Sequence, residues 1–212
     1  MPSRIEDYAL IGDCETAALV ARDGSLDWMC WPRLDSDACF AALLGAPEHG
    51  RWRLAPFGHC RGITRRYLGD TLILETRFET DQGVAKLIDF MPPRSGHSDV
   101  VRMVVGESGN VAMHMQLAVR FGYGSRVPWI HRQEDDTLRI IAGADQVVLR
   151  SAAPVSVADN CIESDFAVAA GETVAFTLTY AASHLVPPDP IDPAGAFATT
   201  KHFWEGWSAK AS

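Results

Sequence analysis

The sequence is poor in cysteine, has no long apolar run and carries no excess of positive charge. Its five cysteines are odd in number and none forms a Cys-x-x-Cys pair, so neither a disulfide framework nor a zinc ribbon is expected. No apolar run reaches the ~18 residues that a membrane span needs, and the first residues lack the apolar core of a signal peptide. These absences predict a soluble, cytoplasmic protein that has no membrane partner.

The charge balance excludes a further class of partner. Lys and Arg number 19 against 27 Asp and Glu in 212 residues, which gives a formal net charge of −8 at pH 7. Excess negative charge repels phosphate backbones, so nucleic acid is not expected as a partner. Hydrophobic residues make up 47% of the chain and charged residues 22%, a balance typical of a globular protein rather than a disordered one.

Motifs for several kinds of catalysis are missing. There is no Gly-x-Ser-x-Gly turn to hold a hydrolase nucleophile and no Gly-x-x-x-x-Gly-Lys-Ser/Thr loop to bind phosphate. The seven histidines lack His-x-x-x-His or His-x-His spacing, so we expect no metal site and no cofactor. The glycine-rich run at residues 121–124 follows a predicted strand and opens no helix, which indicates a loop or bulge rather than a nucleotide site.

Alternation of apolar and polar residues dominates the chain from Tyr8 to Tyr180. Residues 71–80 place apolar side chains on one face, and residues 84–90 return after the turn at 81–83. Further strands are expected at residues 16–22, 25–31, 100–105, 111–119, 138–142, 146–150, 165–169 and 173–180, with a turn at 106–110. Because no long helical crossovers separate them, the sequence predicts an all-β fold, a two-sheet antiparallel β-sandwich over residues 1–186.

Two helices are expected to interrupt this pattern. Residues 37–44 carry an apolar stripe at helical spacing and end at Gly45, which predicts a short helix. Residues 187–190 contain three prolines and predict a stiff, extended connector. Asp192 then precedes Pro193, a cap and first-turn pair that predicts a helix running toward the end of the chain. Residues 187–212 are therefore assigned to a linker and a linker helix.

Candidate binding residues are concentrated in residues 11–36, where carboxylates and two tryptophans surround a tight turn. Carboxylates accept hydrogen bonds from sugar hydroxyls, and an indole ring stacks on the apolar face of a pyranose. We select Asp27, Trp31, Arg33 and Asp35 as residues near a substrate or a domain interface. For Asp35, a structural role as a helix cap is better supported than a binding role. For the other three residues, the two roles are equally supported.

The same region carries a resemblance to a known family. Residues 5–20 (Ile5-Glu6-Asp7-Tyr8-Ala9-Leu10-Ile11-Gly12-Asp13-Cys14-Glu15-Thr16-Ala17-Ala18-Leu19-Val20), 23–28 and 31–36 resemble the opening of bacterial glycoside hydrolase family 15 proteins of the glucoamylase-like or trehalase-like kind. The likeness continues at residues 65–76, 87–92, 127–129 and 203–207. In that family an antiparallel β-sandwich precedes a linker helix and a larger barrel of helical hairpins. The barrel bears two catalytic glutamates that act as acid and base with inversion.

This resemblance implies that the chain is the non-catalytic N-terminal β-sandwich of such an enzyme. No segment matches the barrel motifs, so no catalytic residue is assigned. The implied partners are a missing helical-barrel catalytic domain and an α-glucoside substrate, whose α-glucosidic bond the complete enzyme would hydrolyse. The sandwich would support the barrel, and loop 31–35 would wall its substrate pocket. Trp204 and Trp207 are expected to face the barrel from the interdomain helix, whereas Phe197 is expected to pack on the sandwich itself.

Two other functions stay open from the sequence. A self-standing carbohydrate-binding module would require exposed tryptophans on one face or loop rim. An oligomerisation domain would use the edges of the sheets and the aromatic helix to pair with copies of itself, which would give a homo-oligomer. The sequence does not select among trehalose, maltose, isomaltose and a glucan as the substrate of the complete enzyme.

Overall fold

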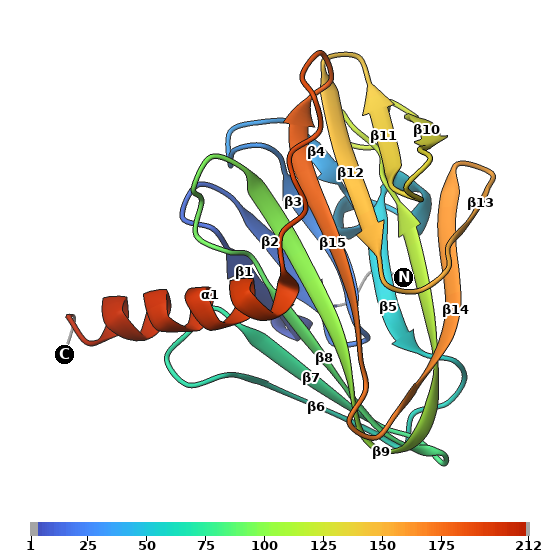
Figure 1. The fold of residues 1–212 in the computed structure, drawn as a ribbon, viewed down its shortest axis with the longest axis vertical. Coiled ribbons are helices and arrows are strands. Elements are labelled where there is room, and N and C mark those ends of the chain that lie inside the picture. Colours follow the sequence, from blue (N-terminus) through green and yellow to red (C-terminus); the bar gives the residue numbers. More distant parts are fainter. Residues whose placement is uncertain (1–3, 211–212) are drawn as a thin grey trace.

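Antiparallel strands followed by one long helix make up residues 4–210, the part of the chain that the computed structural model describes (Figure 1). Residues 1–3 of the predicted sandwich region and residues 211–212 of the predicted linker region lie outside the described residues. The strands are β1 Tyr8–Gly12, β2 Ala17–Ala21, β3 Ser25–Cys30, β4 Ala38–Phe40, β5 Arg51–Pro56, β6 Gly62–Tyr67, β7 Leu74–Glu79, β8 Gly83–Phe90, β9 Ser98–Ala118, β10 Trp129–Arg132, β11 Leu138–Ala142, β12 Asp145–Ser151, β13 Ser156–Ala158, β14 Cys161–Ala169 and β15 Thr173–Ala182. The helices are the 3-10 turns η1 Ile5–Asp7, η2 Ala42–Leu44 and η3 Pro47–His49, and the α-helix α1 Pro193–Ser208. The predicted all-β class is confirmed.

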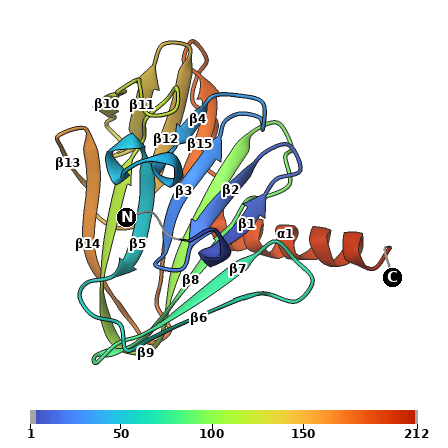
Figure 2. The same ribbon diagram turned by 180° about the vertical axis from the view of Figure 1, so that it is seen from behind.

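Strand β9 belongs to both layers of the sandwich. Its first half pairs with β8 and β15, and its second half pairs with β5 and β14. One layer therefore runs β6-β7-β8-β9-β15-β12-β11-β10. The other runs β1-β2-β3-β5-β9-β14-β13, with β4 added on β3 (Figures 1 and 2).

The predicted turn at residues 106–110 is wrong, because β9 continues through it as one 21-residue strand. Glycine makes this passage possible. A Cβ on Gly106 would lie 2.0 Å from the Ala169 carbonyl oxygen, and Gly109 has a positive φ of 69°. Glycine tolerates both conditions, so the strand bends from one layer into the other while most of its ladder stays intact.

The short helix predicted over residues 37–44 is also wrong. Ala38–Phe40 form strand β4, with Phe40 opposite Met29 of β3, and helical turns are confined to the 3-10 segment Ala42–Leu44. All three residues of β4 are buried. Pairing with β3 thus satisfies their backbone groups inside the fold, and this tertiary contact overrides the weak local helix preference.

The two largest apolar clusters of the described residues hold the fold together. The larger lies between the layers and includes Trp52, Phe40 and Phe176, all fully buried. The smaller lies on the outer face of β7, β8 and β9 and is covered by α1, where the Phe197 ring packs edge-on against Phe90 with 5.9 Å between centroids. The prediction that Phe197 packs on the sandwich is confirmed. The start of α1 is also confirmed, because the Asp192 carboxylate accepts from the Ala194 and Gly195 amides.

A fully buried ion pair joins two neighbouring strands of one layer, and its arginine also reaches the other layer. Arg102 Nε on β9 donates to Asp89 Oδ1 on β8 at 2.8 Å. The same guanidinium donates to the Gly24 carbonyl at 2.7 Å and to the Trp52 carbonyl, both in the opposite layer. Burial raises the pKa of the Asp89 carboxyl above its ordinary value, and the charge of Arg102 opposes that shift. Two sheets are thereby tied together by one side chain.

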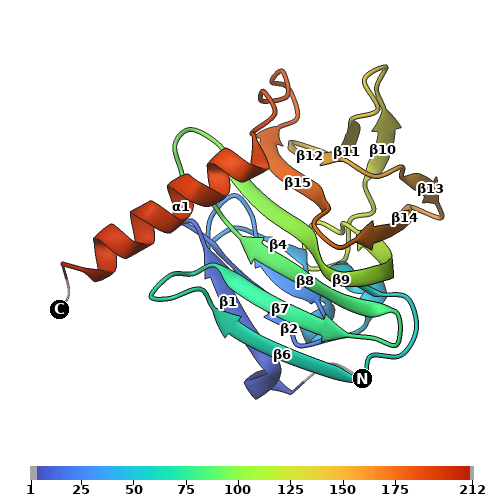
Figure 3. The same cartoon turned by 60° about the horizontal axis from the view of Figure 1, so that its bottom comes forward.

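The edge strands β1 and β6 lie near each other (Figure 3), and side-chain hydrogen bonds rather than a ladder join them. The Tyr67 hydroxyl accepts from the Leu10 amide and donates to the Leu10 carbonyl, both at 2.9 Å. Arg65 donates to the carbonyls of Asp7 and Val20. Arg22 Nη2 donates to the Ile63 carbonyl of β6, so backbone groups of both edge strands are partly occupied along this seam.

Candidate functional site

Three loops meet at one end of the sandwich and form what we call the loop rim, residues 13–16, 31–37 and 91–97. Arg94 links all three. Its guanidinium donates to Asp13 Oδ2 at 2.9 Å, to Glu15 Oε2 at 3.1 Å and to the Pro32 carbonyl at 2.5 Å. Because the Asp13 carboxylate is fully buried, the Arg94 charge compensates a charge that would otherwise be costly. The rim is therefore a rigid platform.

Trp31 is the buried residue of the loop rim and anchors it to strand β9. Its indole Nε1 donates to Ser98 Oγ at 2.7 Å, and Ser98 Oγ donates in turn to Asp13 Oδ2 at 2.6 Å. The ring is 2% exposed and lies 6.0 Å from the Tyr180 ring, centroid to centroid. The indole face is thus occupied by the chain's own core, and the role that this geometry gives Trp31 is to fix the rim.

The four predicted site residues lie in three separate environments. Asp27 is buried on β3, where it accepts from the Tyr8 hydroxyl at 2.7 Å and from the Ser25 hydroxyl. Arg33 and Asp35 pair with each other on the exposed tip of the rim, with Nε and Oδ1 3.0 Å apart. Their charged atoms are solvated, so this pair is the part of the predicted site that a ligand or a neighbouring domain can reach.

Two grooves bring carboxyl groups together. The first, about 350 Å³, lies on the outer face of β6, β7 and β8 and contains Glu75 and Glu107. Arg66 holds Glu75 at 2.7 Å, and Arg77 holds Glu107 at 2.8 Å. Hydrogen bonding to Arg77 lowers the pKa of Glu107. A general acid in glycoside hydrolysis needs the opposite shift, so Glu107 is unsuited to that task.

The second groove, about 490 Å³, lies between α1 and residues 92–99 and contains Asp99 and Asp192. Both oxygens of Asp192 are used to cap α1. Burial raises the pKa of Asp99, whose Oδ1 accepts from the Thr179 hydroxyl at 2.6 Å. One carboxyl here is thus committed to the helix end. Neither of these two grooves presents a free acid and a free base facing each other.

The residues described between 4 and 210 contain no group of three or more His, Cys, Asp or Glu side chains that could hold a metal ion. Among the same residues, no helix is both long enough and apolar enough to cross a bilayer.

Comparison with known proteins decides the family. The chain matches the family described as Trehalase-like, N-terminal, over residues 1–177. It belongs to the trehalase-like N-terminal family. The match covers strands β1 to β14 and half of β15, whereas α1 lies beyond it.

Proteins named trehalase share parts of this sequence. The trehalase of Mycolicibacterium smegmatis is 44% identical over 79 residues, 37% of this chain. The trehalase of Thermoplasma volcanium is 22% identical over 215 residues, 99% of this chain. These alignments cover 12% and 34% of the respective relatives, so the chain spans a minor part of the curated proteins that it matches.

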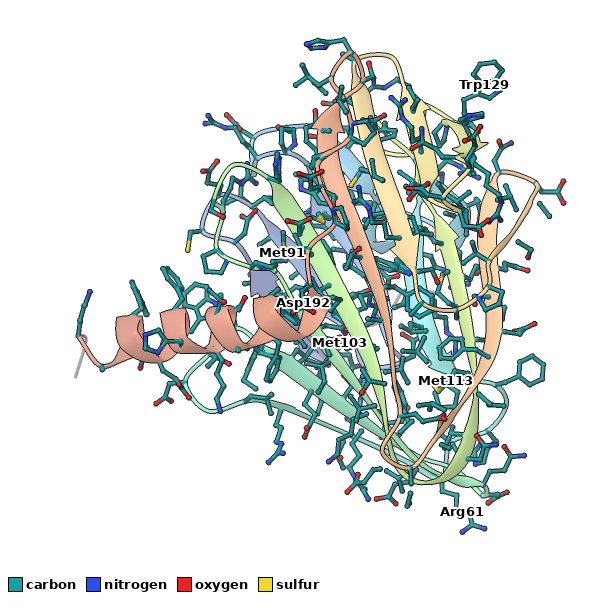
Figure 4. The ribbon with its side chains drawn as sticks, in the orientation of Figure 1. Arg61, Met91, Met103, Met113, Trp129 and Asp192 are labelled. Carbon is teal, nitrogen blue, oxygen red and sulfur yellow. The ribbon has the colours of Figure 1, made fainter. Side chains whose placement is uncertain are left out.

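This trehalase-like N-terminal domain also exposes aromatic residues that the sequence did not single out as site residues. Trp129, on the edge strand β10, is 85% exposed and projects from the molecule in Figure 4. Tyr123 lies in the predicted loop at 121–124, which is confirmed, and has a positive φ of 57°. Positive φ in a non-glycine residue is uncommon and clusters at functional sites. The sequence signal for Trp129 was its place in segment 127–129, which carries part of the family resemblance.

The linker helix is aromatic along its outer half. Trp204 is 8% exposed, whereas Trp207, one turn further on, is 60% exposed. The Trp204 ring meets the rings of Phe203 and Trp207 edge-on, at centroid distances of 5.1 and 6.0 Å. Trp204 Nε1 is buried and has no hydrogen-bond partner among the described residues. This end of α1 extends beyond the sheets (Figure 1).

Proposed function

We propose that this chain is the non-catalytic N-terminal sandwich of a glycoside hydrolase of trehalase type, related to glycoside hydrolase family 15. In this proposal it supports and orients a catalytic barrel of helical hairpins. The observation that carries the proposal is the division of α1: Phe197 packs on the sandwich, whereas Trp207 is exposed on the end of the helix that extends beyond the sheets (Figure 1). A helix with one apolar end packed and one apolar end exposed is suited to join two bodies.

Burial of the exposed end would supply a useful part of the docking energy. A large aromatic side chain gains about 1.5–3 kcal/mol when it is fully removed from water. Trp207 is 60% exposed on the outer end of this helix, and Trp is a frequent energetic anchor of interfaces.

The reaction would belong to the complete enzyme. We assign it to hydrolysis of an α-glucosidic bond by inversion, with two carboxyls about 6.5–9.5 Å apart on the barrel. The relatives named trehalase favour trehalose as the substrate. Arg33 and Asp35 are the rim residues that we propose to face the pocket, because they are exposed on a rigid platform. Trp31 would act indirectly by holding that platform.

An activity assay of the purified 212-residue chain tests the proposal. Trehalose, maltose and isomaltose are incubated with the chain and glucose release is followed; no turnover above a buffer blank is expected. Turnover that survives repurification would overturn the non-catalytic assignment. The coding sequence after codon 212 provides a second test. A helix-rich continuation with paired glutamates is expected, and a continuation of any other kind would contradict the proposal.

A second candidate function, self-association, is favoured by one feature. Among residues 4–210, strand β10 pairs with β11 alone, and the exposed Trp129 lies on this edge strand. Light scattering of the purified chain separates the two cases: a dimer that Trp129→Ala converts to a monomer would support self-association, and a monomeric wild type would dismiss it.

A further inference from the structure

The groove beneath α1 is the largest of the cavities described above, and its walls come from segments far apart in the sequence. One wall is residues 92–99 and the other is the start of α1, where Asp192 lies (Figure 4). A volume of about 490 Å³ is within the range of small-molecule sites. The lining residues are Pro92, Pro93, Ser95, His97, Asp99, Ile191, Asp192, Gly195, Ala196, Thr199, Thr200 and Phe203.

Polar groups with unused bonding capacity meet in this groove. The Thr200 side chain is fully buried, and its hydroxyl has no hydrogen-bond partner among the described residues. A buried hydroxyl without a partner is costly, so its presence points to a group that is missing from the groove. Asp99 lines the same groove and is nearly buried, with Oδ1 bonded to Thr179. Ser95 and His97 are exposed at the mouth.

The rest of the lining is apolar. Pro92, Pro93, Ile191 and Ala196 form smooth walls, and the ring of Phe203 is partly exposed at one end. A ligand for this groove must therefore have an apolar face as well as hydroxyl or amide groups. The charges around the groove narrow the class of ligand further. The Asp99 and Asp192 carboxylates disfavour an anion, and the positive charge of Arg150 acts on Asp99, which weakens its attraction for a cation.

A neutral sugar meets these requirements. One face of a pyranose is apolar and packs on an aromatic ring, while its rim carries hydroxyls that donate to a carboxylate and accept from a hydroxyl or imidazole. We propose that the groove between α1 and residues 92–99 binds a neutral hexose or hexose disaccharide, with Phe203 as the stacking surface and Asp99 and Thr200 as hydrogen-bonding groups. This site is separate from the loop-rim tip at Arg33 and Asp35 and from any pocket on a catalytic barrel.

Calorimetric titration of the purified chain with glucose and with trehalose, up to millimolar concentration, tests the proposal. We expect saturable binding of at least one sugar. Thr200→Val preserves shape and removes one hydrogen bond, so binding should weaken about fivefold. Phe203→Ala should weaken it further. Trp207→Ala is the matched control, because Trp207 is an aromatic residue on the same helix outside the groove, and it should bind as the wild type does.

Three results would overturn the proposal. They are a flat titration with both sugars, binding that Thr200→Val and Phe203→Ala leave unchanged, and binding lost only in Trp129→Ala. Circular dichroism of each variant checks folding. If a variant is unfolded, NMR amide shifts of Gly195 and Thr199 during titration of the wild type serve as the test in its place. Shifts confined to residues outside the groove would contradict the proposed site. A flat titration leaves the proposed function intact, whereas sugar turnover would overturn that function and not this site.

Discussion

Replacement of Asp89 by Asn tests whether the buried ion pair holds the two layers together. The change keeps the shape of the side chain but leaves the Arg102 guanidinium, which is fully buried, without a counter-charge. Breaking a buried pair in this way costs about 3–5 kcal/mol. For a domain of this size, about 2–4 °C of melting temperature is lost per kcal/mol, which gives a decrease of about 6 to 20 °C.

Thermal and urea denaturation followed by circular dichroism at pH 7 measure the loss. Arg102 also donates hydrogen bonds to the carbonyls of Gly24 and Trp52. A double-mutant cycle with Arg102→Met therefore separates the energy of the Asp89–Arg102 interaction from the energy of these other bonds. The double variant should be at least about 2 kcal/mol more stable than the sum of the single losses predicts. An Asp89→Asn variant as stable as the wild type would mean that Asp89 is already protonated in the fold, and the reasoning would fail.

Three further predictions concern single side chains. Ser98→Ala leaves the buried Trp31 indole and one Asp13 oxygen without their shared partner, so urea unfolding should show a loss of about 1–3 kcal/mol, and an unchanged midpoint would contradict the rim network. The Asp99→Asn variant should gain stability relative to the wild type as the pH of the melting experiment rises above about 4. Burial raises the pKa of Asp99 in the folded protein above its pKa in the unfolded chain. The stabilisation from protonated Asp99 is therefore complete below the unfolded-state pKa and is lost as the pH rises through the folded-state pKa. A pH-independent difference would refute this. Trp207→Ala should change stability by less than about 0.5 kcal/mol, because the ring is mostly exposed, and a larger loss in denaturation would show that it packs on the sandwich.

The strands and α1 were predictable because their signals are local. Period-two alternation marks strands such as β7 and β8, and Asp192 before Pro193 marks the start of α1. The continuous strand β9 was not predictable, because Gly106 and Gly109 indicate a turn unless the two flanking sheets are known. Strand β4 was missed for a similar reason: its pairing with β3 is a tertiary contact.

The candidate site was only partly accessible from the sequence. Residue types in segment 11–36 indicated a chemically dense region, and the loop rim does draw on it. The burial of Trp31 depends on Ser98, which lies 67 residues away, and no local pattern reports that contact. The same holds for Asp89 and Arg102, which read as ordinary strand residues until two layers enclose them. Contacts between distant strands decide which polar residues are reachable.

The side-chain seam between β1 and β6 also affects how the molecule meets other chains. A foreign strand that added to β1 would have to displace the Tyr67 hydroxyl from both backbone groups of Leu10, and one that added to β6 would compete with Arg22 for the Ile63 carbonyl. These edges are therefore poor templates for amyloid-like stacking or strand exchange. A barrel removes its strand edges by closing, whereas this open sandwich protects two of its edges with one phenol and two guanidinium groups.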